Sequence, residues 1–107
     1  MPKFLCEVRY GPEGLQGLHK DGAATRKAVV QKAIKSLGGK LESFYFTFGE
    51  RDLVLIADLP DNVTAAALSM TVGETGMVHL NTTPMLTVEE VDKAIKAKKL
   101  KYTAPGA

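Results

Sequence analysis

The polar residues Gly49-Glu50-Arg51-Asp52, which separate two apolar segments, are the first candidates for chemistry in this sequence. A guanidinium beside two carboxylates can hold an anionic or polar ligand, because arginine donates two parallel hydrogen bonds to an oxyanion. The same residues also suit a turn, in which the glycine supplies a positive φ, Asp52 accepts from backbone amides and Arg51 pairs with a neighbouring acid. We favour the turn and keep Arg51 and Asp52 as ligand-binding candidates.

His79 is the candidate catalytic residue, because an imidazole titrates near neutral pH and can act as a general acid or base. Such a lone histidine is more often only hydrogen-bonded within the fold, so the sequence leaves open whether the protein is an enzyme. We expect a ligand to be bound by the polar side chains of Tyr10, Tyr45, Arg51, Asp52 and His79.

Other kinds of site have little support in the spacing of residues. His19, His79 and Cys6 each lack a second ligand at the short spacing of a metal motif, so we expect no metal site and no cofactor. The chain has no Gly-x-Ser-x-Gly sequence, and Cys6 lies in an apolar stretch where a thiol acts as a small hydrophobe. The glycines at 11, 14 and 17 lack the lysine and the spacing of a phosphate-binding loop.

Charge is distributed unevenly along the chain. The formal net charge is +2, but residues 1–92 hold all twelve acids and nine bases, a local sum of −3. The remaining five bases are Lys93, Lys96, Lys98, Lys99 and Lys101. These lysines could attract phosphates, yet no arginine and no set of exposed aromatic residues accompanies them. We therefore favour a solvated helix end and do not expect a nucleic-acid partner.

The composition is typical of one globular domain. Hydrophobic residues make up 45% and charged residues 24% of the 107 residues, enough for one core but not for two. We expect a single domain over residues 1–107, with a basic C-terminal helix and tail from about residue 87. The lone cysteine, the absence of an apolar run near the roughly 20 residues of a membrane span, and a carboxylate at Glu7 predict a cytoplasmic protein without a membrane partner.

The hydrophobic pattern predicts four strands and three helices that position these residues. Strands are expected over residues 3–10, 40–48, 52–59 and 77–85, where apolar residues alternate or run continuously. Helices are expected over residues 23–37, from a cap at Asp61 or Asn62 to Gly73, and from a capping box of Thr87 and Glu90 onward. The glycine-rich residues 11–18 are expected to form a connection that holds one helical turn.

The spacing gives several predicted elements one apolar side. The apolar sides are Phe4, Cys6, Val8 and Tyr10 in the first strand, Val78, Leu80 and Thr82 in the last strand, Val63, Ala66, Ala67 and Met70 in the second helix, and Val88, Val91 and Ile95 in the third. Arg26 belongs to the polar side of the first helix. In the hairpin, a three-residue connection pairs Tyr45 with Leu55, whereas a four-residue connection shifts every partner by one position and reverses the buried face.

The order strand, helix, strand, strand, helix, strand predicts an α+β fold of the ferredoxin-like, split β-α-β type. This fold has a four-stranded antiparallel sheet with two helices on one face, here with an added C-terminal helix. The expected second face has apolar residues in either register. Phe44, Phe46, Val54 and Ile56 share one side, and the other side has Leu41, Tyr45, Leu53, Leu55 and Leu59. An apolar sheet face that no helix covers predicts self-association, and a monomer whose second face is covered by the third helix and the tail is the alternative.

Several stretches of the chain resemble the GYD domain family. They are the run from Leu37 to Asp52, the opening Pro2-Lys3-Phe4 with Pro12-Glu13-Gly14 and Gly17-Leu18, and Leu59-Pro60-Asp61. The resemblance covers most of the chain and implies a ferredoxin-like unit of the dimeric α/β-barrel type, in agreement with the order of elements. Of the Gly, Tyr, Asp motif in the family's hairpin, Gly49 and Asp52 match, and Arg51 stands at the tyrosine position.

Three functions follow as hypotheses. The first is a homo-oligomeric module that binds a small, partly apolar molecule between the helices and the sheet. The alternative is a cofactor-independent enzyme of the dimeric α/β-barrel kind, an oxygenase or isomerase, in which His79 transfers a proton and Arg51 stabilises an enolate. The third is a regulatory or nucleic-acid-associated protein that uses the lysine-rich tail.

Overall fold

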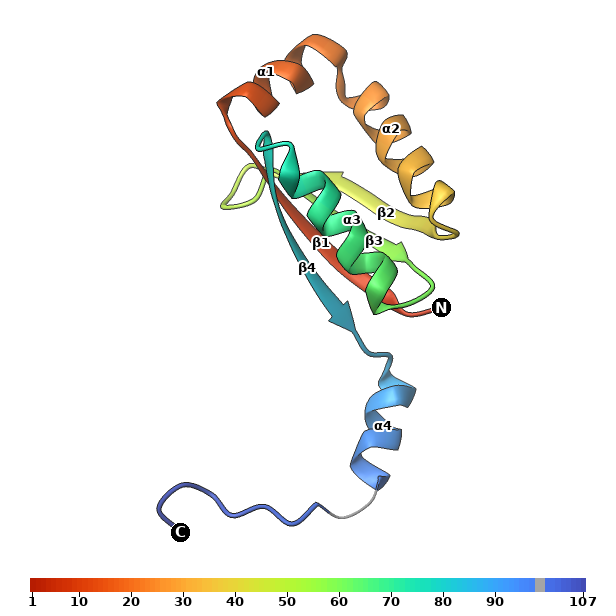
Figure 1. Cartoon of the computed structure of the whole chain (residues 1–107), viewed down its shortest axis with the longest axis vertical. Coiled ribbons are helices and arrows are strands. Elements are labelled where there is room, and N and C mark those ends of the chain that lie inside the picture. The colour runs from red at the N-terminus through yellow and green to blue at the C-terminus, as the bar shows by residue number, and fades with distance from the viewer. Residues whose placement is uncertain (98–99) are drawn as a thin grey trace.

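The computed structural model describes residues 1–97 and 100–107, and within them it has four strands and four helices. In chain order they are β1 (Lys3–Tyr10), α1 (Pro12–Asp21), α2 (Ala23–Ser36), β2 (Lys40–Phe46), β3 (Leu53–Asp58), α3 (Asn62–Glu74), β4 (Val78–Met85) and α4 (Val88–Lys96). All strand pairs are antiparallel, and the sheet order is β2-β3-β1-β4. Helices α2 and α3 lie on one face of the sheet (Figure 1), which confirms the predicted ferredoxin-like α+β fold.

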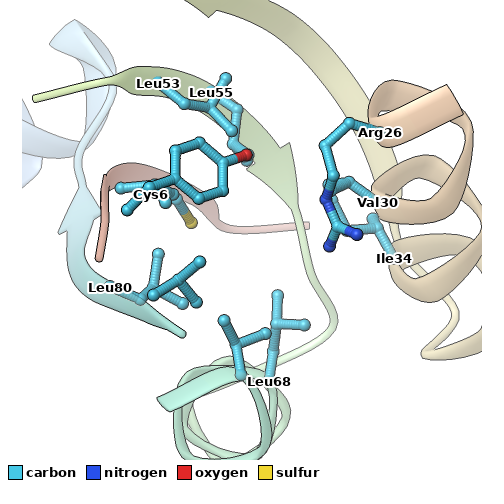
Figure 2. Close-up of a pocket in the computed structure, with 12 residues that line it drawn as sticks. Cys6, Arg26, Val30, Ile34, Leu53, Leu55, Leu68 and Leu80 are labelled. Atoms are coloured by element: carbon cyan, nitrogen blue, oxygen red, sulfur yellow. The ribbon is translucent and has the colours of Figure 1, made fainter. Parts of the chain in front are cut away.

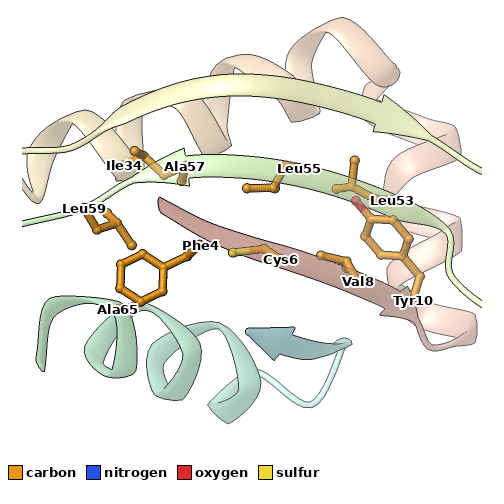
Figure 3. Packing of buried hydrophobic residues seen from close by; sticks show 10 residues of the cluster. All are labelled: Phe4, Cys6, Val8, Tyr10, Ile34, Leu53, Leu55, Ala57, Leu59 and Ala65. Atoms are coloured by element: carbon orange, nitrogen blue, oxygen red, sulfur yellow. The ribbon is translucent and has the colours of Figure 1, made fainter. Parts of the chain in front are cut away.

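The hydrophobic core lies between that face and the two helices. Its centre is the predicted buried side of β1, namely Phe4, Cys6, Val8 and Tyr10 (Figure 3). Alternate residues of β3 join it, together with Ile34 from α2 and Ala65 from α3. On β4, Val78 and Leu80 pack against the cluster, so the predicted sides of both strands are confirmed.

The hairpin between β2 and β3 adopts the register of the four-residue connection. The Thr47 amide donates to the Asp52 carbonyl over 2.9 Å, and residues 48–51 form the loop between them. Phe46 therefore pairs with Leu53 and lies on the helix side of the sheet, while Tyr45 pairs with Val54 on the other side. The predicted grouping of Phe44 and Phe46 with Val54 and Ile56 is wrong, because it assumed the other register.

An irregularity in β2 also affects which side chains face the helices. The pairing of β2 with β3 shifts between Leu41 and Ser43, which leaves Glu42 as an extra residue. This β-bulge puts Leu41 opposite Ala57 and Phe44 opposite Leu55. Leu41 and Phe44 therefore both face the core, although strict alternation would put an odd-numbered and an even-numbered residue on opposite sides. Leu41 is therefore not on the side of Tyr45, as the alternation predicted.

Residues 12–21 form a ten-residue helix, α1, where the sequence predicted a connection with one turn. Pro12 suits the first helical position, because a proline there gives up an amide that has no helical partner. Leu18 packs against the core, whereas Leu15 is 46% exposed. Gly14 is buried against the backbone of Met77, so a glycine that the sequence suggested as a helix breaker serves a close packing contact.

We expect Gly14→Ala to lower the free energy of unfolding by about 1–3 kcal/mol, the usual cost of overpacking. A Cβ at this position would overlap the Met77 carbonyl oxygen and lie 3.1 Å from the Tyr10 ring. Gly17→Ala is the matched control in the same helix, because its Cβ would have no atom within 4 Å. That variant is expected to gain about 0.5–1 kcal/mol from helix propensity. Equal urea midpoints for the two variants would contradict the packing of α1.

Helix α3 begins as predicted but buries a different side. The Asp61 carboxylate caps it by accepting from the Thr64 amide over 2.8 Å. The four residues predicted to be buried are exposed, with Val63 at 79% and Met70 at 69%. Ala65, Leu68 and Val72 face the sheet and cavity instead. Apolar residues occur on several sides of this helix, so their spacing alone does not select the buried one.

Helix α4 projects from the body of the protein beyond the end of β4 (Figure 1). Its predicted capping box is present, since Thr87 Oγ1 accepts from the Glu90 amide and Glu90 Oε1 accepts from the Thr87 amide. The predicted buried side is wrong, because Val88 and Ile95 are 81% and 75% exposed. The helix therefore does not cover the second face of the sheet.

Two further sequence predictions concern the lysines near the C-terminus and membrane-spanning helices. Lys98 and Lys99, two of the five lysines of the basic C-terminal helix and tail, lie outside the described residues. Within the described part of the chain, no helix has the length and hydropathy that crossing a membrane requires.

Candidate functional site

A cavity of about 60 Å³ lies between the covered face of the sheet and helices α2 and α3 (Figure 2). Its floor includes Cys6, Leu53 and Leu55, and its walls include Ile34 from α2 and Leu68 from α3. We call this space the inner cavity. Its lining is apolar except where the side chains of Tyr10 and Arg26 reach it. A phenol and a guanidinium are therefore the polar groups with which this cavity could orient a bound molecule.

Tyr10 is the buried polar group of the inner cavity. Its side chain stands at the end of the core side of β1 (Figure 3), and the residue is 8% exposed. Burial raises the pKa of the Tyr10 phenol, and the nearby Arg26 guanidinium opposes this rise. The phenol therefore stays protonated near neutral pH and offers a hydrogen-bond donor.

Arg26 supplies the positive charge. It extends from the first turn of α2 toward the cavity (Figure 2), and it is partly buried. A second, outer pocket of about 270 Å³ adjoins the inner cavity and shares with it Tyr10, Arg26, Val72 and Val78. The outer pocket is more polar, since Glu13 and Asp21 of α1 also line it. A molecule that entered through the outer pocket would thus meet Arg26 before it reached the apolar floor.

Cys6 lies at the floor of the inner cavity and is 1% exposed. Burial raises the pKa of its thiol, and a hydrogen bond with Thr82 opposes the rise. A protonated thiol is a poor nucleophile, so Cys6 contributes an apolar wall rather than a reactive group.

Asp52, a predicted ligand-binding residue, is joined to the end of β1. Its carboxylate accepts from the Tyr10 amide over 2.8 Å, and its own amide donates to the Val8 carbonyl over 2.8 Å. The structure thus brings Asp52 and Tyr10 together, but through the backbone of Tyr10. Asp52 positions the strand that carries the phenol, and its carboxylate already accepts the hydrogen bond from the Tyr10 amide.

The other three predicted site residues belong to the opposite side of the sheet, which we call the open face. Arg51 Nε lies 3.9 Å from a carboxylate oxygen of Glu7, a residue of β1 that points away from the core. His79 pairs with Arg9 in the β1–β4 register and is exposed, and Tyr45 is 70% exposed. The predicted single site is therefore divided between two faces, and of its residues only Tyr10 lines the inner cavity. Tyr10 and His79 come together in a separate, open pocket of about 370 Å³ where β1 and β4 pair.

Metal binding has no geometric basis in the residues that the structure describes. In residues 1–97 and 100–107, no three side chains of the histidine, cysteine, aspartate or glutamate type come together as metal ligands would.

A comparison with models of known protein families identifies the family of this chain. The family model of the GYD domain matches residues 4–95, most of the 107 residues. The protein belongs to the GYD domain family. A search of curated proteins finds no match. In this GYD domain the hairpin motif residue Asp52 has a structural role, because its carboxylate and amide both bond to β1.

Arg26 is the charged residue at the inner cavity that the sequence-based predictions did not include. It was assigned to the polar side of its helix, yet it lines both the inner cavity and the outer pocket. The signal was its spacing, since Arg26, Val30 and Ile34 recur every fourth residue and so share one side of α2. A charged residue that shares a helix side with two core residues indicates where the buried side of that helix meets solvent.

We expect Asp52→Ala to lower the free energy of unfolding by about 1–3 kcal/mol, because it leaves a buried strand amide without its charged acceptor. The control is Glu50→Ala, an exposed acid of the same loop, which is expected to change stability by less than about 0.5 kcal/mol. Urea denaturation measures both. If the two variants were equally stable, the bond to Tyr10 would not hold the hairpin against β1.

Proposed function

We propose that this GYD domain binds a small, partly apolar molecule in the inner cavity between its helices and sheet. The observation that carries the proposal is an apolar cavity with one phenol and one guanidinium at the side where it meets a larger, solvent-open pocket. Ligand sites in proteins combine a mostly apolar lining with a few polar groups that orient the ligand.

Physical chemistry favours occupation of such a space. The side chains around an unfilled apolar cavity lack contact partners on one side, and a ligand that fills it restores dispersion contacts without displacing well-bonded water. A ligand that binds only the folded chain then raises its thermal stability by mass action.

A thermal-shift screen of small organic molecules with Val72→Phe tests this proposal. Val72 lines both spaces, so the larger ring is expected to fill them and abolish the shifts seen with the wild-type protein. The control is the same change at Val63, which lies in the same helix and is 79% exposed. Val63→Phe is expected to keep the shifts. Shifts of unchanged size in Val72→Phe would place the binding elsewhere.

The enzyme alternative assigns proton transfer to His79 and stabilisation of an enolate to Arg51, and neither residue lines the inner cavity. The protonated thiol of Cys6 adds no nucleophile at the cavity floor. We therefore propose a binding protein, and the groups with which it would orient a ligand are Tyr10 and Arg26.

The open face supports a second part of the proposal, self-association of the chain. Its centre is a partly buried apolar strip of Leu5, Val54 and Ile56, beside the exposed ring of Tyr45. Ionic groups lie at both ends of this strip. Lys3 pairs with Glu42 and Asp58 at one end, over 2.8 and 2.9 Å, and Glu7 pairs with Arg51 at the other.

A second copy of the chain would suit such a face. Helices α2 and α3 lie on the other side, and α4 projects away from the sheet, so the alternative of a monomer covered by α4 has no support in its position (Figure 1). Both signs of charge lie at the ends of the strip, and a two-fold axis can bring opposite charges together.

We also propose that the protein is located in the cytoplasm, where a free thiol such as that of the buried Cys6 stays reduced.

A further inference from the structure

Arg26 combines three properties that define a ligand class. It carries a full charge, it borders an apolar cavity, and within residues 1–97 and 100–107 it forms no ion pair, although Glu13 and Asp21 line the same outer pocket. A partly desolvated cation without a partner gains from an anion that binds there. Lys3 and Arg51 differ from Arg26, since Lys3 contacts two carboxylates and Arg51 contacts one.

Tyr10 strengthens the preference for an anionic oxygen. Its phenol reaches the same junction of the two spaces and stays protonated, because burial raises its pKa. A neutral phenol donates its proton to an acceptor, and the guanidinium has donors only. Two kinds of donor thus converge where a carboxylate can accept from both.

The size of the inner cavity limits the rest of the molecule. At about 60 Å³ it is well below the roughly 150 Å³ of a protein cavity known to take a benzene ring. The part of the ligand that enters is therefore a short or branched aliphatic group. The polar end has to remain at the junction, because the floor beyond it consists of apolar side chains and a protonated thiol.

We propose that the ligand is a short-chain aliphatic carboxylic acid, whose carboxylate binds Arg26 and Tyr10 and whose alkyl group fills the inner cavity. This inference rests on the proposed binding function and names its ligand class. Arg26 is the residue that determines specificity for the charge, and the volume of the cavity determines the length of the chain.

Calorimetric or NMR titration with 3-methylbutanoate and 3-methylbutanamide tests the ligand class, because the two probes have the same shape and differ in charge. The acid is expected to bind the wild-type protein at least tenfold more tightly than the amide, the usual advantage of a charged hydrogen bond. Arg26→Met is expected to remove this difference in affinity and to leave the affinity for the amide unchanged. Tyr10→Phe is expected to lower the affinity for the acid severalfold.

Lys27→Met is the matched control, because it removes a cation from the next position of α2 at an exposed residue that lines neither space. It is expected to keep the tenfold preference, and Arg26→Gln replaces Arg26→Met if the latter does not fold. Equal binding of acid and amide by the wild-type protein would overturn the ligand class and leave the binding function standing. Failure of both probes, and of every molecule in the thermal-shift screen, would overturn both.

Discussion

Replacing Ile34 by alanine is expected to lower the free energy of unfolding by about 2–5 kcal/mol, the range for a large-to-small change in a packed core. Ile34 is 1% exposed and packs between α2 and the sheet, where it forms a wall of the inner cavity. The lost contacts and the larger void both add to the cost. Urea denaturation with two-state analysis measures the change.

The same variant is expected to accept a larger ligand. With the side chain of Ile34 shortened, the cavity gains the volume of three carbons, so the ring of benzoate becomes able to enter while the wild-type protein prefers 3-methylbutanoate. Val29→Ala is the control, because Val29 lies on the same helix and is 48% exposed. It should change neither stability nor ligand size by much. An Ile34→Ala protein of wild-type stability would show that the core is not packed as described.

Replacing Ile56 by glutamate is expected to convert a self-associated protein into a monomer. Ile56 pairs with Leu5 at the centre of the open face, so an interface there would have to bury a carboxylate without a partner. The cost of an unpaired buried charge exceeds what one apolar contact contributes to association. Light scattering after size exclusion, at several micromolar concentrations, measures the mass.

The control for this experiment is Val63→Glu, which puts the same charge on an exposed position of α3. It is expected to keep the wild-type mass. Circular dichroism shows whether Ile56→Glu remains folded, and thermal shifts with ligand are expected to persist in it, because the inner cavity lies on the other side of the sheet. A wild-type mass of 11.5 kDa at every concentration would refute self-association through this face.

The individual elements could be predicted because their signals are local. The alternation of Phe4, Cys6 and Val8 defines the core side of a strand whatever its partners are. The capping box of Thr87 and Glu90 forms within one turn of a helix, and Asp61 caps α3 in the same way. Such contacts involve residues up to three positions apart, so a reader of the sequence sees all of the groups that take part.

The division of the candidate site between two faces could not be predicted in this way. Whether Tyr45 faces the core or the open face depends on a shift of one residue between β2 and β3, and on the bulge at Glu42. Both registers bury apolar residues, so composition does not distinguish them. The bonds that decide between them join Asp52 to β1, over 40 residues away in the chain.

The sequence by itself determined the order of the strands and of α2, α3 and α4, and the caps of α3 and α4, because each of these depends on neighbouring residues. Only the tertiary structure decided that Arg26, and not Arg51 or His79, lines the inner cavity with Tyr10. It also turned α3 so that Val72 faces that cavity and Val63 faces solvent. The physical reason is that a helix with several apolar sides, or a strand with two, can pack in more than one way, and long-range contacts select one of them.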